Sequence, residues 1–159
     1  MADGVSVERE VAAPAERVWA LVSDITQVGR WSPETASCEW IGGAAGPAVG
    51  TRFKGRNEIG SKRWSTVCTV TDAEPGSRFA FEVKAGPLKV ARWEYRIEPA
   101  GAGCRVTETW TDQRGKLIGV LGKAKTGVDD RVAHNRAGMA ETLERLADAA
   151  EAAPSDATG

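Results

Sequence analysis

Between Gly50 and Asp112 the chain places apolar and aromatic side chains at alternate positions, and this alternation limits the fold more than any other feature of the sequence. The positions that share one parity are Phe53, Asn57 and Ile59; Trp64, Thr66, Cys68 and Val70; Phe79, Phe81 and Val83; Trp93, Tyr95 and Ile97; and Val106, Glu108 and Trp110. Successive side chains of a strand point to opposite faces of a sheet, so each set lies on one face of its strand. A face this apolar needs a cover, and the best candidate is the amphipathic segment near the C-terminus.

Glycine and proline divide this region into separate strands. The expected strands lie near 5–12, 35–41, 51–59, 62–72, 77–84, 89–98 and 104–112. Gly60 and Ser61 are typical of a two-residue hairpin in which glycine takes the first central position of a type II′ turn. The region from 35 to 112 is therefore interpreted as an antiparallel meander.

Helical segments are expected on both sides of the meander. Pro14 suits the first turn of a helix over about 14–23, and the capping-box spacing of Asp24 and Gln27 predicts a second short helix directly after it. From Val128 onward apolar residues recur at helical spacing, which predicts a long C-terminal helix. Thr126, Asp129 and Asp130 suit its start. Before it, an apolar segment hinged by glycines, with Leu117, Ile118, Val120 and Leu121, is interpreted either as a lid over an opening or as the first turn of the same helix.

Composition sets the broad class. At 159 residues the chain fits one domain, expected over 1–150, followed by a disordered tail over 151–159. The net charge of −1 argues against nucleic acid as a partner. The three cysteines have no metal-site spacing, and no segment has the length of a membrane span. We expect a cytoplasmic protein with no metal, no cofactor and no membrane partner.

Five short runs resemble the polyketide cyclase/dehydrase branch of the START-like (SRPBCC) superfamily. They are Ala13-Pro14-Ala15-Glu16-Arg17-Val18-Trp19, Trp31-Ser32-Pro33, Gly50-Thr51-Arg52-Phe53-Lys54-Gly55-Arg56-Asn57, Arg92-Trp93-Glu94-Tyr95 and Thr142-Leu143-Glu144-Arg145-Leu146. The resemblance implies the α+β helix-grip, or Bet v 1-like, fold. In that fold a curved antiparallel sheet wraps around a long C-terminal helix, two short helices follow the first strand, and a ligand cavity lies between the sheet and the long helix.

Three polar residues on the apolar face are candidates for chemistry. Glu108 lies between Val106 and Trp110, and burial of a carboxylate raises its affinity for a proton, as a general base near neutrality requires. The alternative is a hydrogen-bonded or arginine-paired glutamate that holds the strand to a helix. Tyr95 and Asn57 either bind a ligand oxygen or bond to the backbone. For Tyr95 the alternative is a buried ring whose hydroxyl has a backbone partner, and for Asn57 it is a bond to backbone groups at an opening or a bulge.

The same face predicts a cavity wall rich in aromatic rings, although strand periodicity does not separate cavity wall from packed core. The candidate ligand-binding residues are Trp31, Phe53, Asn57, Trp64, Thr66, Phe79, Phe81, Trp93, Tyr95, Glu108, Trp110 and Asn135. The only histidine, His134, lies one residue off the apolar stripe of the long helix and is expected on the surface.

Three functions fit these patterns. The first is binding of a small hydrophobic, ring-containing ligand, polyketide-like or lipid-like. The second is a cyclase/dehydrase in which Glu108 removes a proton beside a carbonyl while Asn57 or Tyr95 stabilises the enolate oxygen. The third is a partner-binding module whose cavity is filled.

The opposite sheet face has a different character, because cations outnumber anions on it. The cations are Arg52, Lys54, Arg56, Arg63, Arg78, Lys84, Arg92, Arg96 and Arg105, and the anions are Glu58, Glu82, Glu94 and Glu98. This face is a candidate for docking an acidic carrier protein.

Overall fold

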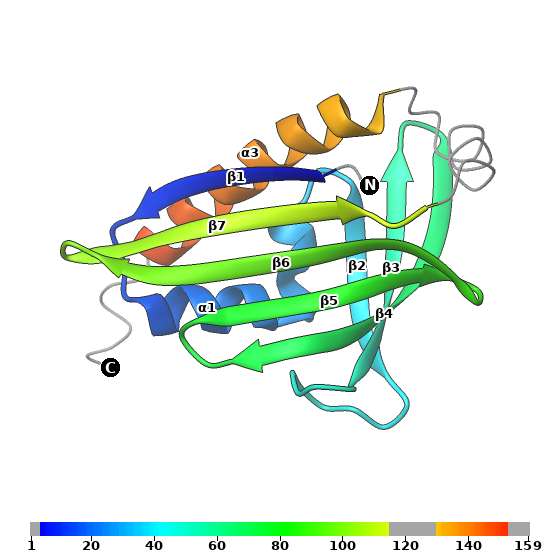
Figure 1. Ribbon diagram of the computed structural model, residues 1–159, viewed down its shortest axis with the longest axis horizontal. Coiled ribbons are helices and arrows are strands. Elements are labelled where there is room, and N and C mark those ends of the chain that lie inside the picture. The colour runs from blue at the N-terminus through cyan, green and yellow to red at the C-terminus, as the bar shows by residue number, and fades with distance from the viewer. Residues whose placement is uncertain (1–3, 115–129, 153–159) are drawn as a thin grey trace.

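Seven strands form one antiparallel sheet in the computed structural model, which describes residues 4–114 and 130–152. In chain order the elements are β1 (Gly4–Val11), α1 (Ala15–Ser23), the 3₁₀ helix η1 (Ile25–Arg30), β2 (Thr35–Ile41), β3 (Arg52–Ile59), β4 (Lys62–Glu74), β5 (Arg78–Ala85), β6 (Leu88–Ala100), β7 (Gly103–Asp112) and α3 (Arg131–Glu151). The strand order is β1-β7-β6-β5-β4-β3-β2, so β2 to β7 form a meander and β1 joins its end (Figure 1). The predicted helix-grip fold is confirmed.

The strand register agrees with the alternation in the sequence. On β7 the buried side chains are Cys104, Val106, Glu108 and Trp110, every second residue. Between β6 and β7, Tyr95 lies directly opposite Glu108. The β3–β4 hairpin closes at Gly60, whose φ of 58° is the positive value that the predicted turn requires of its first central residue.

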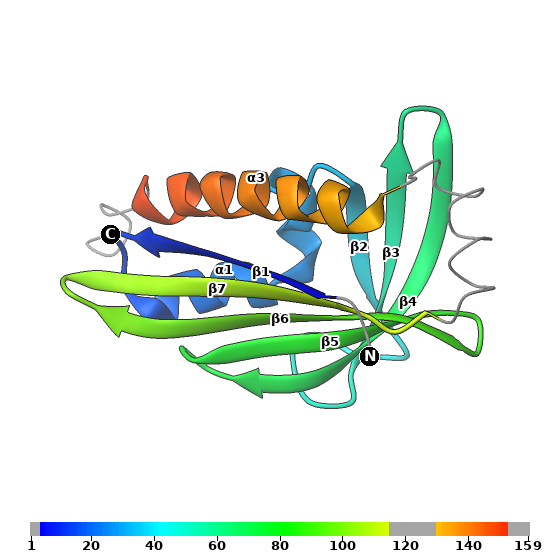
Figure 2. The same cartoon turned by 45° about the horizontal axis from the view of Figure 1, so that its top comes forward.

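The sheet is curved, and the curve makes room for a cavity. Figure 2 shows β2, β3 and the adjoining part of β4 rising out of the plane of β5, β6 and β7 beside the N-terminal end of α3. The pairing of β4 with β5 shifts register between Val70 and Asp72. An irregularity of this kind bends a strand and increases its twist, and β4 therefore serves both parts of the sheet.

The long helix α3 lies across the concave face of the sheet (Figure 2). Its buried side chains include Met139, Leu143 and Leu146, which belong to the same apolar core as Val18 of α1. The side chain of Asp130 caps α3 by accepting a hydrogen bond from the Ala133 amide at 3.0 Å. None of the described helices is long and apolar enough to cross a membrane.

Some expectations concern residues outside the described part of the chain. These are the capping residues Thr126 and Asp129, the apolar segment with Leu117, Ile118, Val120 and Leu121, and the tail beyond 152. Within the described part, the expected tail overlaps the chain only at Glu151, where α3 ends, and at Ala152, which caps the helix. The second short helix is the 3₁₀ helix η1, with Asp24 accepting a hydrogen bond from the Thr26 amide at 3.2 Å.

The outer face of the sheet carries ion pairs that link β4, β5 and β6 and one pair within β6. Asp72 of β4 contacts Arg92 of β6 at 2.7 Å, and Glu94 contacts Arg78 at 3.7 Å and Arg92 at 3.6 Å. Asp72 was absent from the predicted set of anions because the bulge in β4 shifts the register that the sequence pattern assumed. These pairs neutralise part of the positive charge, and docking of an acidic carrier here stays a prediction.

Candidate ligand site

A cavity of about 450 Å³ lies between the concave face of the sheet and the N-terminal half of α3. Of the predicted ligand-binding residues, those that line it are Trp31, Phe53, Asn57, Trp64, Thr66, Phe81, Trp93, Tyr95, Glu108, Trp110 and Asn135. Small-molecule sites usually have volumes of roughly 300–1,000 Å³, so the cavity has room for a compact organic ligand.

Aromatic rings form much of this wall. Trp93 and Trp110, opposite each other on β6 and β7, have ring centroids 6.5 Å apart. Phe53 and Phe81 pack edge to face with centroids 5.1 Å apart. Rings that pack on one another in this way are held at defined angles, and they offer flat apolar surfaces to a ligand.

Phe79 does not line the cavity, although it shares the parity of Phe81. Its side chain is fully buried and packs against the Phe81 ring at a centroid distance of 5.7 Å. At this end of β5 the inner face is covered by α1, whose Val18 and Val22 belong to the same core cluster. Phe79 is therefore a core residue, and the helix α1 is the reason that the cavity does not extend to it.

Glu108 and Tyr95 form a hydrogen-bonded pair in the buried wall. The Tyr95 hydroxyl donates to Glu108 Oε2 at 2.9 Å, and the two residues are 8% and 2% exposed. Glu108 Oε1 is buried and has no hydrogen-bond partner among the described residues. Glu108 is therefore hydrogen-bonded, as one alternative expected, but its partner is a tyrosine on the neighbouring strand β6 and not a group on a helix.

Burial shifts the protonation of both groups. Loss of hydration raises the pKa of Glu108 from 4.5 to about 8, and the hydrogen bond from Tyr95 opposes part of that rise. The pKa of Tyr95 is raised well above its ordinary value by burial and by the neighbouring carboxyl. At neutral pH the pair is therefore mainly in its neutral form.

Asn57 connects three strands at another part of the wall. Its Oδ1 accepts a hydrogen bond from the Thr35 hydroxyl at 2.9 Å, and its Nδ2 donates to Thr66 Oγ1 at 3.4 Å. Asn57 is 7% exposed, so these bonds satisfy a buried amide. Asn57 and Glu108 both line the cavity, but no hydrogen bond joins them among the described residues.

A polar cluster at the start of α3 also contributes to the wall. Glu34, just before β2, accepts a hydrogen bond from Arg131 at 2.8 Å, and its Oε1 lies 3.0 Å from His134 Nε2. Arg131 also donates to Asn135 Oδ1 at 3.3 Å. His134 was expected on the surface, and its side chain is 36% exposed, but the ring also lines the cavity beside Glu34.

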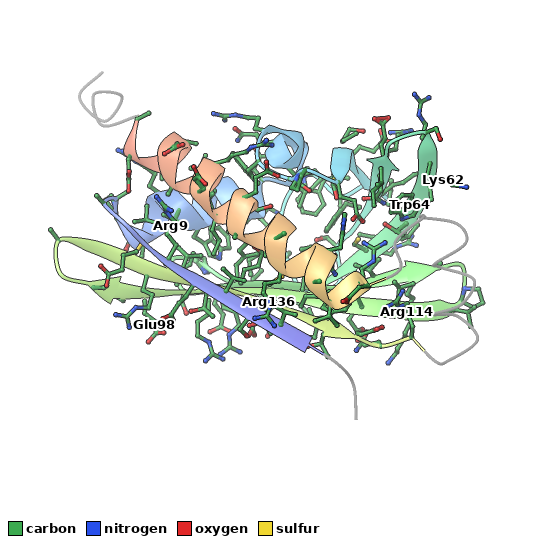
Figure 3. The ribbon with its side chains drawn as sticks, turned by 90° about the horizontal axis from the view of Figure 1, so that it is seen from above. Arg9, Lys62, Trp64, Glu98, Arg114 and Arg136 are labelled. Atoms are coloured by element: carbon green, nitrogen blue, oxygen red, sulfur yellow. The ribbon has the colours of Figure 1, made fainter. Side chains whose placement is uncertain are left out.

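Arg114 lines the cavity beyond the end of β7. Its guanidinium forms a two-point pair with Asp112, with Nε to Oδ1 and Nη2 to Oδ2 both at 2.8 Å. Partial burial acts to raise the pKa of Asp112, but the hydrogen bonds and charge of Arg114, with the charge of Arg131, lower it below its ordinary value. Figure 3 shows Arg114 and Trp64 at the same end of the molecule, beside the N-terminal end of α3.

Sequence reasoning missed the part of the wall that α3 supplies. Only Asn135 was named on this helix, although the cavity-lining positions are Arg131, His134, Asn135, Gly138, Met139 and Thr142. Their spacing of three and four residues defines one helical face, and this signal was present in the sequence. The face was not recognised because only apolar residues defined the buried stripe of the helix, whereas the cavity-lining residues of its first turn are polar.

Potential metal ligands do not cluster in the described part of the chain. No group of three or more histidine, cysteine, aspartate or glutamate side chains is arranged there to hold an ion. Cys38 and Cys68 on the cavity wall are free thiols, and burial raises the pKa of Cys38 to about 12.

Comparison with known proteins gives one family. The family model described as "Polyketide cyclase / dehydrase and lipid transport" matches residues 3–151. No curated protein is significantly similar to the chain in sequence.

Several solved structures are similar to this one. A polyketide-cyclase-like protein of Corynebacterium glutamicum, Cgl2372, is 32% identical, with a TM-score of 0.53 over 94% of this chain and 83% of that one. Protein CV1439 of Chromobacterium violaceum has a TM-score of 0.70 at 16% identity, covering 94% and 98% of the two chains. Major latex-like protein 151 of Panax ginseng has a TM-score of 0.71 at 10% identity, covering 94% and 97%. The last two similarities show the fold alone.

Proposed function

The chain belongs to the polyketide cyclase/dehydrase and lipid-transport family, and from this membership we propose that it binds a small hydrophobic, ring-containing ligand in the cavity between the sheet and α3. The observation that carries the proposal is the wall itself. Aromatic rings such as Trp93, Trp110 and Phe53 line a space of about 450 Å³, and most of the surface that faces this space is apolar. Small-molecule sites have this combination of mainly apolar surface and polar groups that orient the ligand.

Native mass spectrometry of freshly purified protein tests the proposal. We expect a bound species whose mass is lost on denaturation, and extraction of that species would identify its class. Titration with naphthalene and anthracene derivatives, followed by tryptophan fluorescence, supplies a second measurement because Trp93 and Trp110 lie on the wall. A protein that carries nothing and binds none of these ring compounds would refute the proposal.

A cyclase/dehydrase is the second candidate, and Glu108 Oε1 is the observation that favours it. This buried atom belongs to a cavity-lining residue and has no protein partner among the described residues, as a group that moves a proton to or from a substrate requires. With a pKa of about 8, Glu108 acts as a base mainly above that pH, so the rate should rise with pH through this value. Replacement by glutamine would abolish turnover and leave binding intact; unchanged turnover would exclude Glu108 as the base.

A partner-binding module with a filled interior is the weakest of the three candidates. Such a module needs no space beside its aromatic residues, whereas the cavity here is large enough for a ligand. Retention of a small molecule by the purified protein would separate the first two candidates from this one.

A further inference from the structure

One buried atom in the cavity wall lacks a partner, and it limits what the ligand can be. Three buried side-chain atoms have no hydrogen-bond partner among the described residues, and only Glu108 Oε1 belongs to a residue that lines the cavity. Two other buried polar residues of the wall, Asn57 and Asn135, have protein partners. Because an unsatisfied buried polar group is costly, a ligand that satisfies Glu108 Oε1 has an advantage over one that does not.

The protonation state of Glu108 decides which ligand atom fits. The Tyr95 hydroxyl donates to Oε2, so that oxygen acts as an acceptor. Glu108 is buried in the wall of the cavity, with Trp110 two residues along β7 and Trp93 on β6 as further lining residues. A neutral carboxyl is stable in such a place, whereas an ionised one with a single hydrogen bond is not. Because Oε2 accepts from Tyr95, the neutral group carries its proton on Oε1, which is then a donor without a protein acceptor among the described residues.

The charged groups on the surrounding elements do not change this assignment. On α3, Arg131 and His134 contact Glu34, and beyond β7 Arg114 contacts Asp112. On β1, the residue opposite Glu108 is Val7, and Arg9 on the same face of that strand is exposed. Cys38 and Cys68, the thiols of the wall, have raised pKa values and are neutral. The described structure therefore has no cation in contact with Glu108.

We propose that the ligand carries a carbonyl on its ring system and that the protonated Glu108 carboxyl donates a hydrogen bond from Oε1 to this carbonyl oxygen. This inference rests on the proposed binding function and adds the ligand's polar group to it. A carbonyl binds to the neutral acid without any change of charge. An amine would instead take the proton and leave an ion pair in an apolar wall, which costs free energy that the pair does not always recover. The pKa of about 8 agrees with the neutral form at physiological pH.

Three probes with one ring system test the assignment: acetylnaphthalene, ethylnaphthalene and naphthylethylamine. Their dissociation constants are measured by tryptophan fluorescence at about pH 6 and about pH 9, on either side of the pKa of Glu108. In the wild-type protein we expect the ketone to bind about fivefold to tenfold more tightly than the hydrocarbon at the lower pH. At the higher pH this preference should disappear, because the ionised carboxylate has no proton to donate.

Two variants separate the hydrogen bond from the shape of the cavity. Glu108→Gln retains an N–H donor, so its ketone preference should persist at both pH values. Glu108→Leu has no donor and should bind ketone and hydrocarbon equally. If the leucine variant does not fold, the pH profiles of the wild-type and glutamine proteins decide the question.

The outcomes that overturn the inference differ from those that overturn the binding function. Equal binding of ketone and hydrocarbon by the wild-type protein at the lower pH would reject the carbonyl assignment and leave the binding function intact. If the amine binds most tightly, and its affinity rises as Glu108 ionises, the carbonyl assignment is rejected and the ligand's polar group is a cation. Failure of all three probes to bind would overturn the cavity function and the carbonyl assignment together.

Discussion

Glu108→Gln is expected to remove a pH-dependent loss of stability that the Glu108 carboxyl imposes on the folded chain. Glutamine has nearly the same shape, and its side-chain oxygen still accepts the hydrogen bond that Tyr95 donates to Glu108 Oε2. The variant differs from the wild type mainly in that it does not titrate. Comparison of the two proteins therefore isolates the free energy of ionising one buried carboxyl.

The size of the effect follows from the shift in pKa. Below about pH 4.5 Glu108 is protonated in both the folded and the unfolded chain, so ionisation costs nothing. Between pH 4.5 and about 8 the unfolded chain loses this proton while the folded chain keeps it, and the free energy of unfolding falls as pH rises. At about 1.4 kcal/mol per pH unit, the loss reaches on the order of 5 kcal/mol and then stays constant above pH 8.

Urea denaturation of both proteins, at steps between about pH 5 and pH 9, measures this difference. We expect the glutamine variant to become progressively more stable than the wild type as pH rises, with the gain levelling off near pH 8. Glu98→Gln, which alters an exposed glutamate on the neighbouring strand β6, controls for the loss of one negative charge. If the free energies of unfolding of wild type and Glu108→Gln change in parallel with pH, the claim that Glu108 is a buried carboxyl with a raised pKa is refuted.

Three further predictions concern the same wall. Tyr95→Phe removes the hydrogen bond that lowers the pKa of Glu108, so in pH-dependent unfolding the levelling-off should move above about pH 8; a downward move would contradict the assigned donor. Gly55 lines the cavity, and a Cβ added there would meet its nearest atom at 3.5 Å, so Gly55→Leu should weaken binding of ethylnaphthalene by at least about tenfold. The control Gly46→Leu adds its side chain in open space and should bind as the wild type does. Equal affinities of the two variants in fluorescence titrations would place the ligand elsewhere. Phe79→Ala should lower the free energy of unfolding by about 3–5 kcal/mol with little change in the affinity for ethylnaphthalene, and a large loss of affinity in an otherwise folded protein would show that this ring contacts the ligand.

Much of the fold was predictable because its signals are local. The alternation on β7 placed Glu108 on the inner face, and the same rule on β6 placed Tyr95 there, so the pair was expected on one surface before any contact was known. The hairpin at Gly60 followed from turn chemistry in the same way. These predictions succeed because side-chain direction in a strand and the dihedral angles of a turn depend on residues close in sequence.

The polar cluster at the start of α3 was not predictable by this reasoning. Glu34 meets Arg131 across 97 residues of sequence and His134 across 100, so no local pattern joins them. Asn57 likewise bonds to the side chains of Thr35 and Thr66 on two neighbouring strands, whereas the sequence had suggested a ligand or backbone groups as its partners. Contacts of this kind depend on where the helix crosses the sheet.

By itself, the sequence determined which side chains share the inner face and in which order the strands and helices follow one another. Only the tertiary structure decided which parts of that face are packed and which are open. Phe79 and Phe81 have the same parity, but α1 covers the first, while the second borders the cavity. The physical reason is that strand periodicity sets the direction of a side chain. Whether that side chain packs against protein or borders a cavity depends on helices that long-range packing puts in place.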